Sequence, residues 1–168
     1  MSLFVQWEQQ MGAFIAPYTD HSQARVPFMI SVAINALKSL YNVRPSEEIR
    51  GLILRAVQDL VENCIDEFTG LFYYKQLPSL DVNVLSVLVF SPLTYAYQFT
   101  GDKKYLEYAL PTFREIMRKM PAGGGGKSAS YHCVISGTAS SSNKAFSSGA
   151  PHLMVYYKAL MDTGLLEA

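Results

Sequence analysis

The chain has 168 residues, about the length of one average domain. Apolar residues make up 49% and charged residues 17%, which supplies ample material for a core and excludes a disordered chain. Fourteen basic residues balance fourteen acidic ones, so the chain lacks the basic excess that nucleic acids or anionic membrane surfaces attract. We therefore expect one domain over residues 1–168, with neither nucleic acid nor a membrane as its partner.

The N-terminal residues do not predict a targeting signal. No basic segment precedes the first apolar residues, and Gln6 and Glu8 interrupt them. The most apolar stretch, residues 82–99, contains Pro92 and Gln98, which favours a buried helix over a membrane span. We expect a soluble chain, and the compartment stays open because a longer parent protein could be secreted.

Two segments have the periodicity of amphipathic helices. Over residues 46–66 apolar side chains recur at steps of three and four, and Ser46 is placed to cap the helix. Residues 102–120 repeat this pattern around Pro111, which should kink the helix. Cys64 falls on the apolar face of the first helix, so we expect it in the core.

Three other segments are apolar on nearly every side, namely residues 26–41, 84–99 and 151–161. A helix without a polar face is normally covered all round. The alternation of the two helix types along the chain therefore predicts two layers, with the fully apolar helices in the inner layer.

The links between these helices support the same arrangement. Links from an inner to an outer helix are short, whereas the returning links, residues 67–83 and 121–149, are long. The pair Thr100-Gly101 recurs as Thr163-Gly164, as in a loose hairpin repeat. We predict an all-α fold of antiparallel helical hairpins in two layers, with residues 121–149 as a long flexible loop. All long links then meet at one end, beside the N-termini of the inner helices.

The run Tyr97-Gln98-Phe99-Thr100-Gly101-Asp102 follows an aromatic-rich helix and resembles the hairpin turn of six-hairpin (α/α)-toroid proteins. Residues 25–29 are similar to the start of an inner helix of that fold. The family includes many glycoside hydrolases and polysaccharide lyases, so the resemblance implies a carbohydrate-related domain with its cleft at the long-link end. The chain supplies only about half of a toroid. It is then the C-terminal part of a longer protein, a short open array, or half of a homodimer.

The segment before residue 26 contains a polar cluster of Asp20, His21 and Arg25. One interpretation is a substrate site, in which His21 acts as a base and Arg25 clamps the carboxylate of a uronate. The other interpretation is structural, with Asp20 capping a helix and Arg25 as a solvated charge.

The second long link predicts a turn at Gly70 followed by a short extended piece. Tyr73 and Tyr74 would point to opposite sides of that piece, so one of them can stack on a sugar ring, or both pack against helix ends. Asp66, Glu67 and Asp81 are the carboxylates available for a catalytic pair, and Asp81 is equally a helix N-cap.

The third long link begins with four glycines before Lys127. They follow a helix instead of a strand, so they predict a flexible linker and not a phosphate loop. Tyr131 and His132, further along, would lie on a lid over the cleft if this link is ordered. The three histidines are too far apart in sequence for a metal-ligand motif, and we expect no metal and no other cofactor.

Two hypotheses of function follow from these features. The first is a carbohydrate-related domain that binds or processes an oligosaccharide at the long-link end, as a glycoside hydrolase or polysaccharide lyase if it is active. The alternative is a non-catalytic helical scaffold that binds another domain of a parent chain or a second copy of itself.

Overall fold

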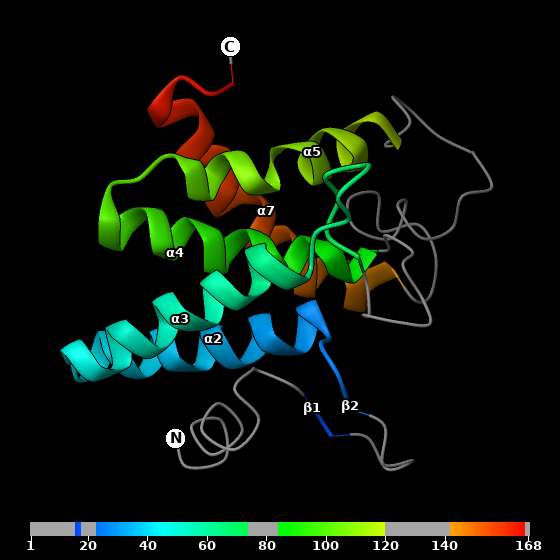
Figure 1. Ribbon diagram of the computed structural model, residues 1–168. Coiled ribbons are helices and arrows are strands. Elements are labelled where there is room, and N and C mark those ends of the chain that lie inside the picture. The colour runs from blue at the N-terminus through cyan, green and yellow to red at the C-terminus, as the bar shows by residue number, and fades with distance from the viewer. Residues whose placement is uncertain (1–15, 18–22, 74–83, 120–141, 167–168) are drawn as a thin grey trace.

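The computed structural model describes residues 16–17, 23–73, 84–119 and 142–166, and these residues are mainly helical (Figure 1). Within them, five α-helices and one 3-10 helix pack against one another, which confirms the predicted all-α class. Ahead of the first of these helices, β1 (Ala16–Pro17) and β2 (Gln23–Ala24) form a short antiparallel pair.

The first hairpin joins α2 (Pro27–Val43) to α3 (Glu47–Asn63). Pro27 occupies the first turn of α2. Its missing N–H costs no hydrogen bond there, because the first N–H groups of a helix have no partner within the helix. The Ser46 hydroxyl accepts a hydrogen bond from the Ile49 N–H at 3.1 Å. The predicted N-cap of α3 is therefore confirmed.

The segment predicted as one apolar helix from residue 84 consists of η1 (Val84–Val89), a 3-10 helix, and α4 (Phe90–Thr100). Pro92 accounts for the position at which the α-helix begins. Proline is tolerated in the first turn, where its N–H would lack a helical partner, but not further inside. Gly101 ends α4 in the left-handed conformation, with φ at 74°, and its N–H donates to the Tyr97 carbonyl at 2.7 Å.

The second hairpin continues into α5 (Lys104–Lys119), and the last helix is α7 (Ser142–Thr163). The predicted start of this last helix at residue 151 is wrong, because Pro151 stands inside α7. The C-terminal part of the predicted loop 121–149 is therefore helical, and the rest of it, residues 121–141, lies outside the described residues. α7 packs along η1 and α4, and such tertiary contacts override the weak helix propensity of its serine and glycine residues.

The ends of α4 and α7 share one geometry. Gly164 follows α7 with φ at 72°, as Gly101 follows α4. The hydroxyls of Thr100 and Thr163 each donate to the carbonyl four residues earlier, at 2.7 Å. The two Thr-Gly pairs are thus similar helix ends, as the sequence repeat predicts, although the Gly164 N–H donates to the carbonyl three residues earlier, at 3.2 Å.

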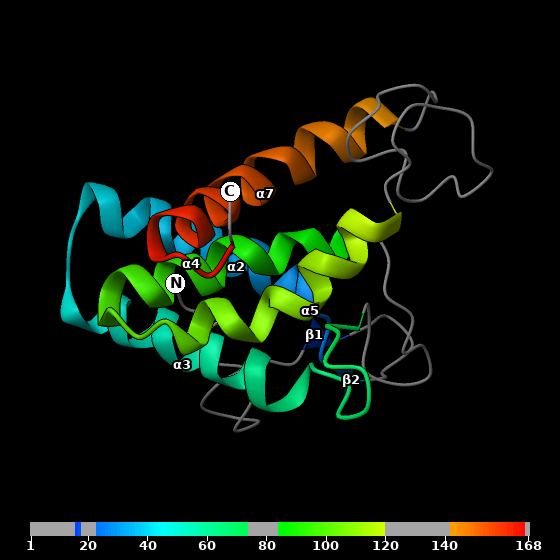
Figure 2. The ribbon, with the colours of Figure 1, turned by 90° about the horizontal axis from the view of Figure 1, so that it is seen from above.

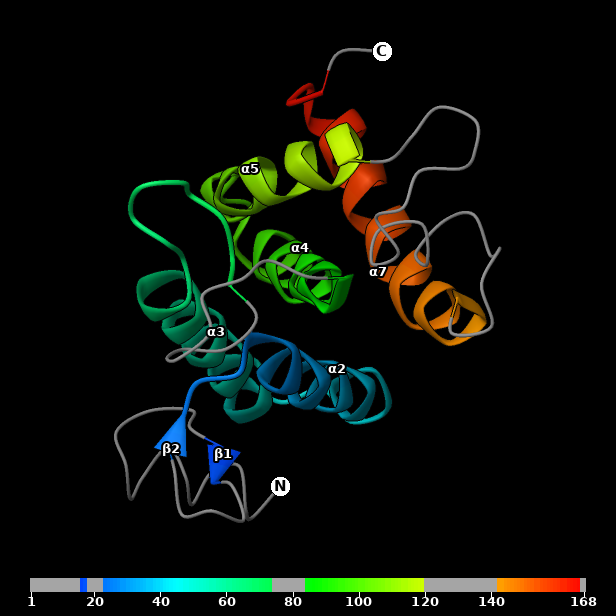
Figure 3. The ribbon, with the colours of Figure 1, turned by 90° about the vertical axis from the view of Figure 1, so that its right-hand side faces the viewer.

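The helices form two layers around α4. Seen from the side in Figure 3, α4 lies in the middle, and α2, α3, α5 and α7 contact it from different sides. α2, α4 and α7 run in one direction, whereas α3 and α5 return (Figure 1). The helix ends that the long links join therefore lie at one end of the array, as the view from above in Figure 2 also shows.

Aromatic side chains join the layers in the core. The Tyr156 ring of α7 is fully buried and stacks on Phe90 of α4, with 4.7 Å between the ring centroids. Phe113 of α5 packs at 5.6 Å from the same ring, and the Tyr156 hydroxyl donates to the Leu106 carbonyl. Cys64 is fully buried, which confirms its predicted place in the core.

The expectation that the inner helices are covered on all sides is wrong for α2 and α7. Val32 on α2 keeps 54% of its surface exposed, and Met154 on α7 keeps 62%. η1 and α4 bury the opposite sides of both helices, and within the described residues no further helix covers these outward sides. The array therefore leaves the outward sides of α2 and α7 exposed.

The link after α3 contains the predicted turn. Gly70 has φ at 69°, and the Asp66 carboxylate accepts hydrogen bonds from the N–H and the hydroxyl of Thr69 at 2.8 and 2.6 Å. These hydrogen bonds hold the pKa of Asp66 below its usual value. Up to Tyr73, where the described part of this link ends, the predicted extended piece consists of a single antiparallel bridge between Ile65 and Phe72.

Candidate functional site

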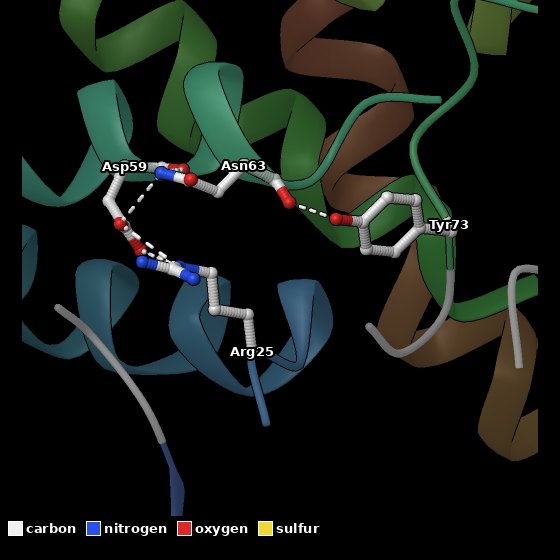
Figure 4. A network of polar contacts seen from close by, with 4 residues as sticks. All are labelled: Arg25, Asp59, Asn63 and Tyr73. Carbon is white, nitrogen blue, oxygen red and sulfur yellow. Dashed lines mark hydrogen bonds and ion pairs between the residues drawn. The ribbon is translucent and has the colours of Figure 1, made fainter. Parts of the chain in front are cut away.

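Four polar residues form a network at the long-link end (Figure 4). Arg25, just before α2, pairs its Nε with both carboxylate oxygens of Asp59 on α3, at 3.1 Å each. The Asn63 amide donates to the same carboxylate at 3.1 Å. The Tyr73 hydroxyl, from the link after α3, donates to the Asn63 carbonyl. The network therefore joins the start of α2, the end of α3 and the following link.

This geometry gives Arg25 and Tyr73 partners within the fold. The side chains of Arg25 and Asp59 are only 17% and 11% exposed, so Arg25 is not the solvated charge of the structural interpretation. Tyr73 is buried, and burial, with a smaller effect of Cys64, raises the pKa of its hydroxyl to about 12. Burial also raises the pKa of the Cys64 thiol far above its usual value, so the thiol stays protonated and unreactive. Contact of Arg25 or Tyr73 with a substrate stays a prediction.

The other predicted site residues lie outside the described residues. Their roles in binding or catalysis stay predictions, and the set comprises Asp20, His21, Tyr74, Asp81, Tyr131 and His132.

A serine and a histidine that the sequence analysis did not single out come together between α4 and α7. The His152 Nδ1 lies 2.7 Å from the Ser91 Oγ. Burial lowers the pKa of His152, so the ring is neutral at pH 7. Ser91, however, is only 2% exposed. A substrate cannot reach the Ser91 hydroxyl in this conformation. The hydrogen bond between His152 and Ser91 joins the two helices.

A cluster of aromatic and polar side chains lies between the C-terminal halves of α2 and α4. The Lys38 ammonium lies 5.4 to 5.8 Å from the ring centroids of Tyr41, Tyr95 and Phe99. The Tyr95 hydroxyl donates to the Asn35 amide oxygen at 3.0 Å. All five side chains are partly exposed, so a ligand can approach them. We call this set the Lys38 cluster.

On its other side, α4 forms a groove with α7. The groove has a volume of about 630 Å³, within the size range of ligand sites. Its lining is mostly apolar, with one Lys158–Asp162 ion pair at 2.6 Å. It is lined by Tyr97 and Gln98 of α4 and by Met154, Val155, Lys158, Ala159 and Asp162 of α7.

Both surfaces lie toward the short-link end, opposite the end that the sequence predicts for a site. The spacing of Asn35, Lys38 and Tyr41 places these residues on one side of α2, a signal that sequence reasoning can use. The packing of that side against Tyr95 and Phe99 was not available from the sequence, because it depends on how α2 and α4 cross.

Comparisons of the chain with protein families, with curated proteins and with solved structures give no match. Among the described residues, no group of three His, Cys, Asp or Glu side chains is placed to hold a metal ion. No helix in the described ranges is long and apolar enough to cross a membrane.

Proposed function

We propose that the protein is a non-catalytic helical interaction domain, in which a protein partner covers the exposed apolar sides of α2 and α7. One observation carries the proposal. Of the ten large apolar side chains exposed in the described residues, seven lie on α2 or α7 and none on α3. They are Met29, Val32, Leu40 and Val43 on α2 and Met154, Val155 and Tyr157 on α7.

The composition of α2 favours contact of its exposed side with a partner. Apart from Lys38, its residues carry no charge, and its inner side is already buried against η1, α3 and α4. Full burial of a valine, leucine or methionine side chain contributes about 1.5–3 kcal/mol. Val32 is 54% and Val43 is 85% exposed, so burial of each side chain by a partner would contribute on the order of 1 kcal/mol to binding. Several such side chains in one row form a surface that favours association.

The partner that we propose is a second copy of the chain. The formal net charge is zero and the isoelectric point is about 6.8, so two copies do not repel each other near neutral pH. The apolar sides of α2 and α7 also carry few charged groups that contact would remove from water.

Sedimentation equilibrium of the full chain tests this proposal. We expect the wild type to dimerise and Met29→Glu, on the exposed side of α2, to weaken the dimer at least tenfold. Met117→Glu on α5 is the matched control, because both methionines are 43% exposed. Thermal unfolding of both variants shows whether each keeps the fold. A wild type that stays monomeric at the highest concentration reached, or equal effects of the two substitutions, would overturn the proposal.

A second candidate function, binding of an acidic oligosaccharide, is supported by the Lys38 cluster. Aromatic faces beside an amide and an ammonium are the groups that sugar rings and uronate carboxylates contact. Lys38 and Asn35 supply the polar groups, and Tyr41, Tyr95 and Phe99 supply the rings. This candidate retains the carbohydrate class implied by the toroid resemblance but moves the site to the short-link end.

Thermal-shift measurements with neutral and uronate-containing oligosaccharides test the second candidate. A ligand that binds only the folded chain raises the melting temperature. We expect uronates to raise it for the wild type and for Lys104→Met, an exposed control, but not for Lys38→Met. No shift of the wild type with any oligosaccharide would refute this candidate.

A further inference from the structure

We infer that the exposed row on α2 of one copy docks in the α4–α7 groove of a second copy, an inference that rests on the proposed function. The row, which we call the α2 stripe, consists of Met29, Val32, Ala36, Leu40 and Val43, all of them exposed. The groove is the cavity of about 630 Å³ between the C-terminal half of α4 and α7.

The spacing of the α2 stripe fits a groove between two helices. Its residues follow one another at steps of three or four, which keeps them on one side of α2. Helices recognised by apolar grooves present their anchors at such steps. From Met29 to Val43 the stripe is about 21 Å long, and the groove from Met154 to Asp162 is about 12 Å long, at a rise of about 1.5 Å per residue. The groove thus receives a little over half of the stripe.

The charges of the two surfaces also match. Lys38 is the only charged residue of α2, and its ammonium is already held by the rings of the Lys38 cluster. In the groove, Lys158 and Asp162 neutralise each other. An uncharged stripe therefore meets a lining without an unpaired charge, and docking does not bury a charge without its partner.

The dimer that we infer is two-fold. The stripe and the groove lie on adjacent sides of α4, because α2 and α7 are neighbours around it and each packs against the η1–α4 segment (Figure 3). In a two-fold dimer each copy then offers its stripe to the partner and receives the partner's stripe in its own groove. Such a dimer contains the same contact twice and closes on itself.

A complementation experiment distinguishes this arrangement from a dimer in which two identical surfaces meet. Val32→Glu changes the stripe, and Val155→Glu changes the groove. Val155 is 39% exposed, and Tyr108→Glu on α5, where the side chain is 37% exposed, is the matched control. Each variant is measured alone and in mixture by sedimentation velocity with one component labelled, and circular dichroism monitors folding.

We expect Val32→Glu and Val155→Glu to be monomeric alone and to form a heterodimer when mixed, because one stripe and one groove stay intact. Both variants gain a negative charge, so charge attraction cannot explain the heterodimer. If Val155→Glu alone still dimerises, or if the mixture stays monomeric, the inference is overturned while the proposed function stands. A monomeric wild type overturns both.

Discussion

Replacement of Arg25 by methionine separates a structural role of this residue from a role in binding an anion. In the fold, the Arg25 Nε lies 3.1 Å from each carboxylate oxygen of Asp59. Methionine keeps most of the length of the side chain but not the charge. The substitution therefore leaves the Asp59 carboxylate with the Asn63 amide as its remaining partner in the network of Figure 4.

The expected loss of stability follows from the distance between the Arg25 and Asp59 side chains and from their burial. At 3.1 Å, Coulomb's law gives about 5 kcal/mol at an effective dielectric constant of about 20 and about 1 kcal/mol in bulk water. The side chains are 17% and 11% exposed, so the pair lies between these limits, and desolvation offsets part of the attraction. We expect Arg25→Met to lower the free energy of unfolding by about 2 kcal/mol. For a chain of this length, that lowers the melting temperature by roughly 4–8 °C.

Urea unfolding of the wild type, Arg25→Met, Asp59→Asn and the double variant provides the assay. The double-mutant cycle isolates the coupling of the two side chains, which we expect to exceed about 1 kcal/mol. A coupling near zero with an unchanged melting temperature would refute the structural role. Arg25 would then be available for the anion that the uronate hypothesis assigns to it.

Three further comparisons test the packing. Thr112→Val, which removes the hydroxyl that accepts a buried backbone N–H, should destabilise the fold by about 1–3 kcal/mol in urea unfolding, whereas Thr94→Val, which removes only a bond within its own helix, should be nearly neutral. Gly101→Ala should cost about 1 kcal/mol because φ is positive, whereas Gly51→Ala inside α3 should stabilise by a similar amount, as melting temperatures will show. Burial lowers the pKa of His152 below 6.5, so its neutral form stabilises the fold above that pH and this contribution is lost as the pH falls. Between pH 7 and pH 5 the wild type should lose more stability than His152→Gln, and equal losses would contradict the assignment.

Local signals allowed much of the fold to be predicted from the sequence. Ser46 marks the start of α3 through its side-chain hydroxyl, and Gly101 marks the end of α4 through its left-handed backbone, so both helix ends follow from local sequence. The predicted start of the last helix at Pro151 is wrong, because the packing of α7 on η1 and α4 accommodates a proline within the helix. Helix ends are local, but helix extent depends on contacts that only the folded chain provides.

The candidate site was harder to predict, because its residues come from separate helices. Nothing in the sequence pairs Arg25 with Asp59 or His152 with Ser91, since these pairs meet only through packing of their helices. The exposed side of α2 is not predicted from the sequence, because an apolar helix is expected to be covered on every side. Periodicity gives the composition of each side of a helix, but not whether the chain itself supplies a cover for it.

The proposed interaction function is supported by the exposed apolar side chains in the described part of the chain. At the long-link end, Arg25 pairs with Asp59, the Asn63 amide donates to the same carboxylate, and Tyr73 donates to the Asn63 carbonyl, so each of these residues has a partner within the fold. Burial without access likewise keeps Ser91 from acting as a nucleophile. The apolar side chains on α2 and α7 are still exposed to water, and contact with another surface would stabilise them by removing them from it. Under the proposed function, association would stabilise the domain, so the oligomeric state is the property that tests this function most directly.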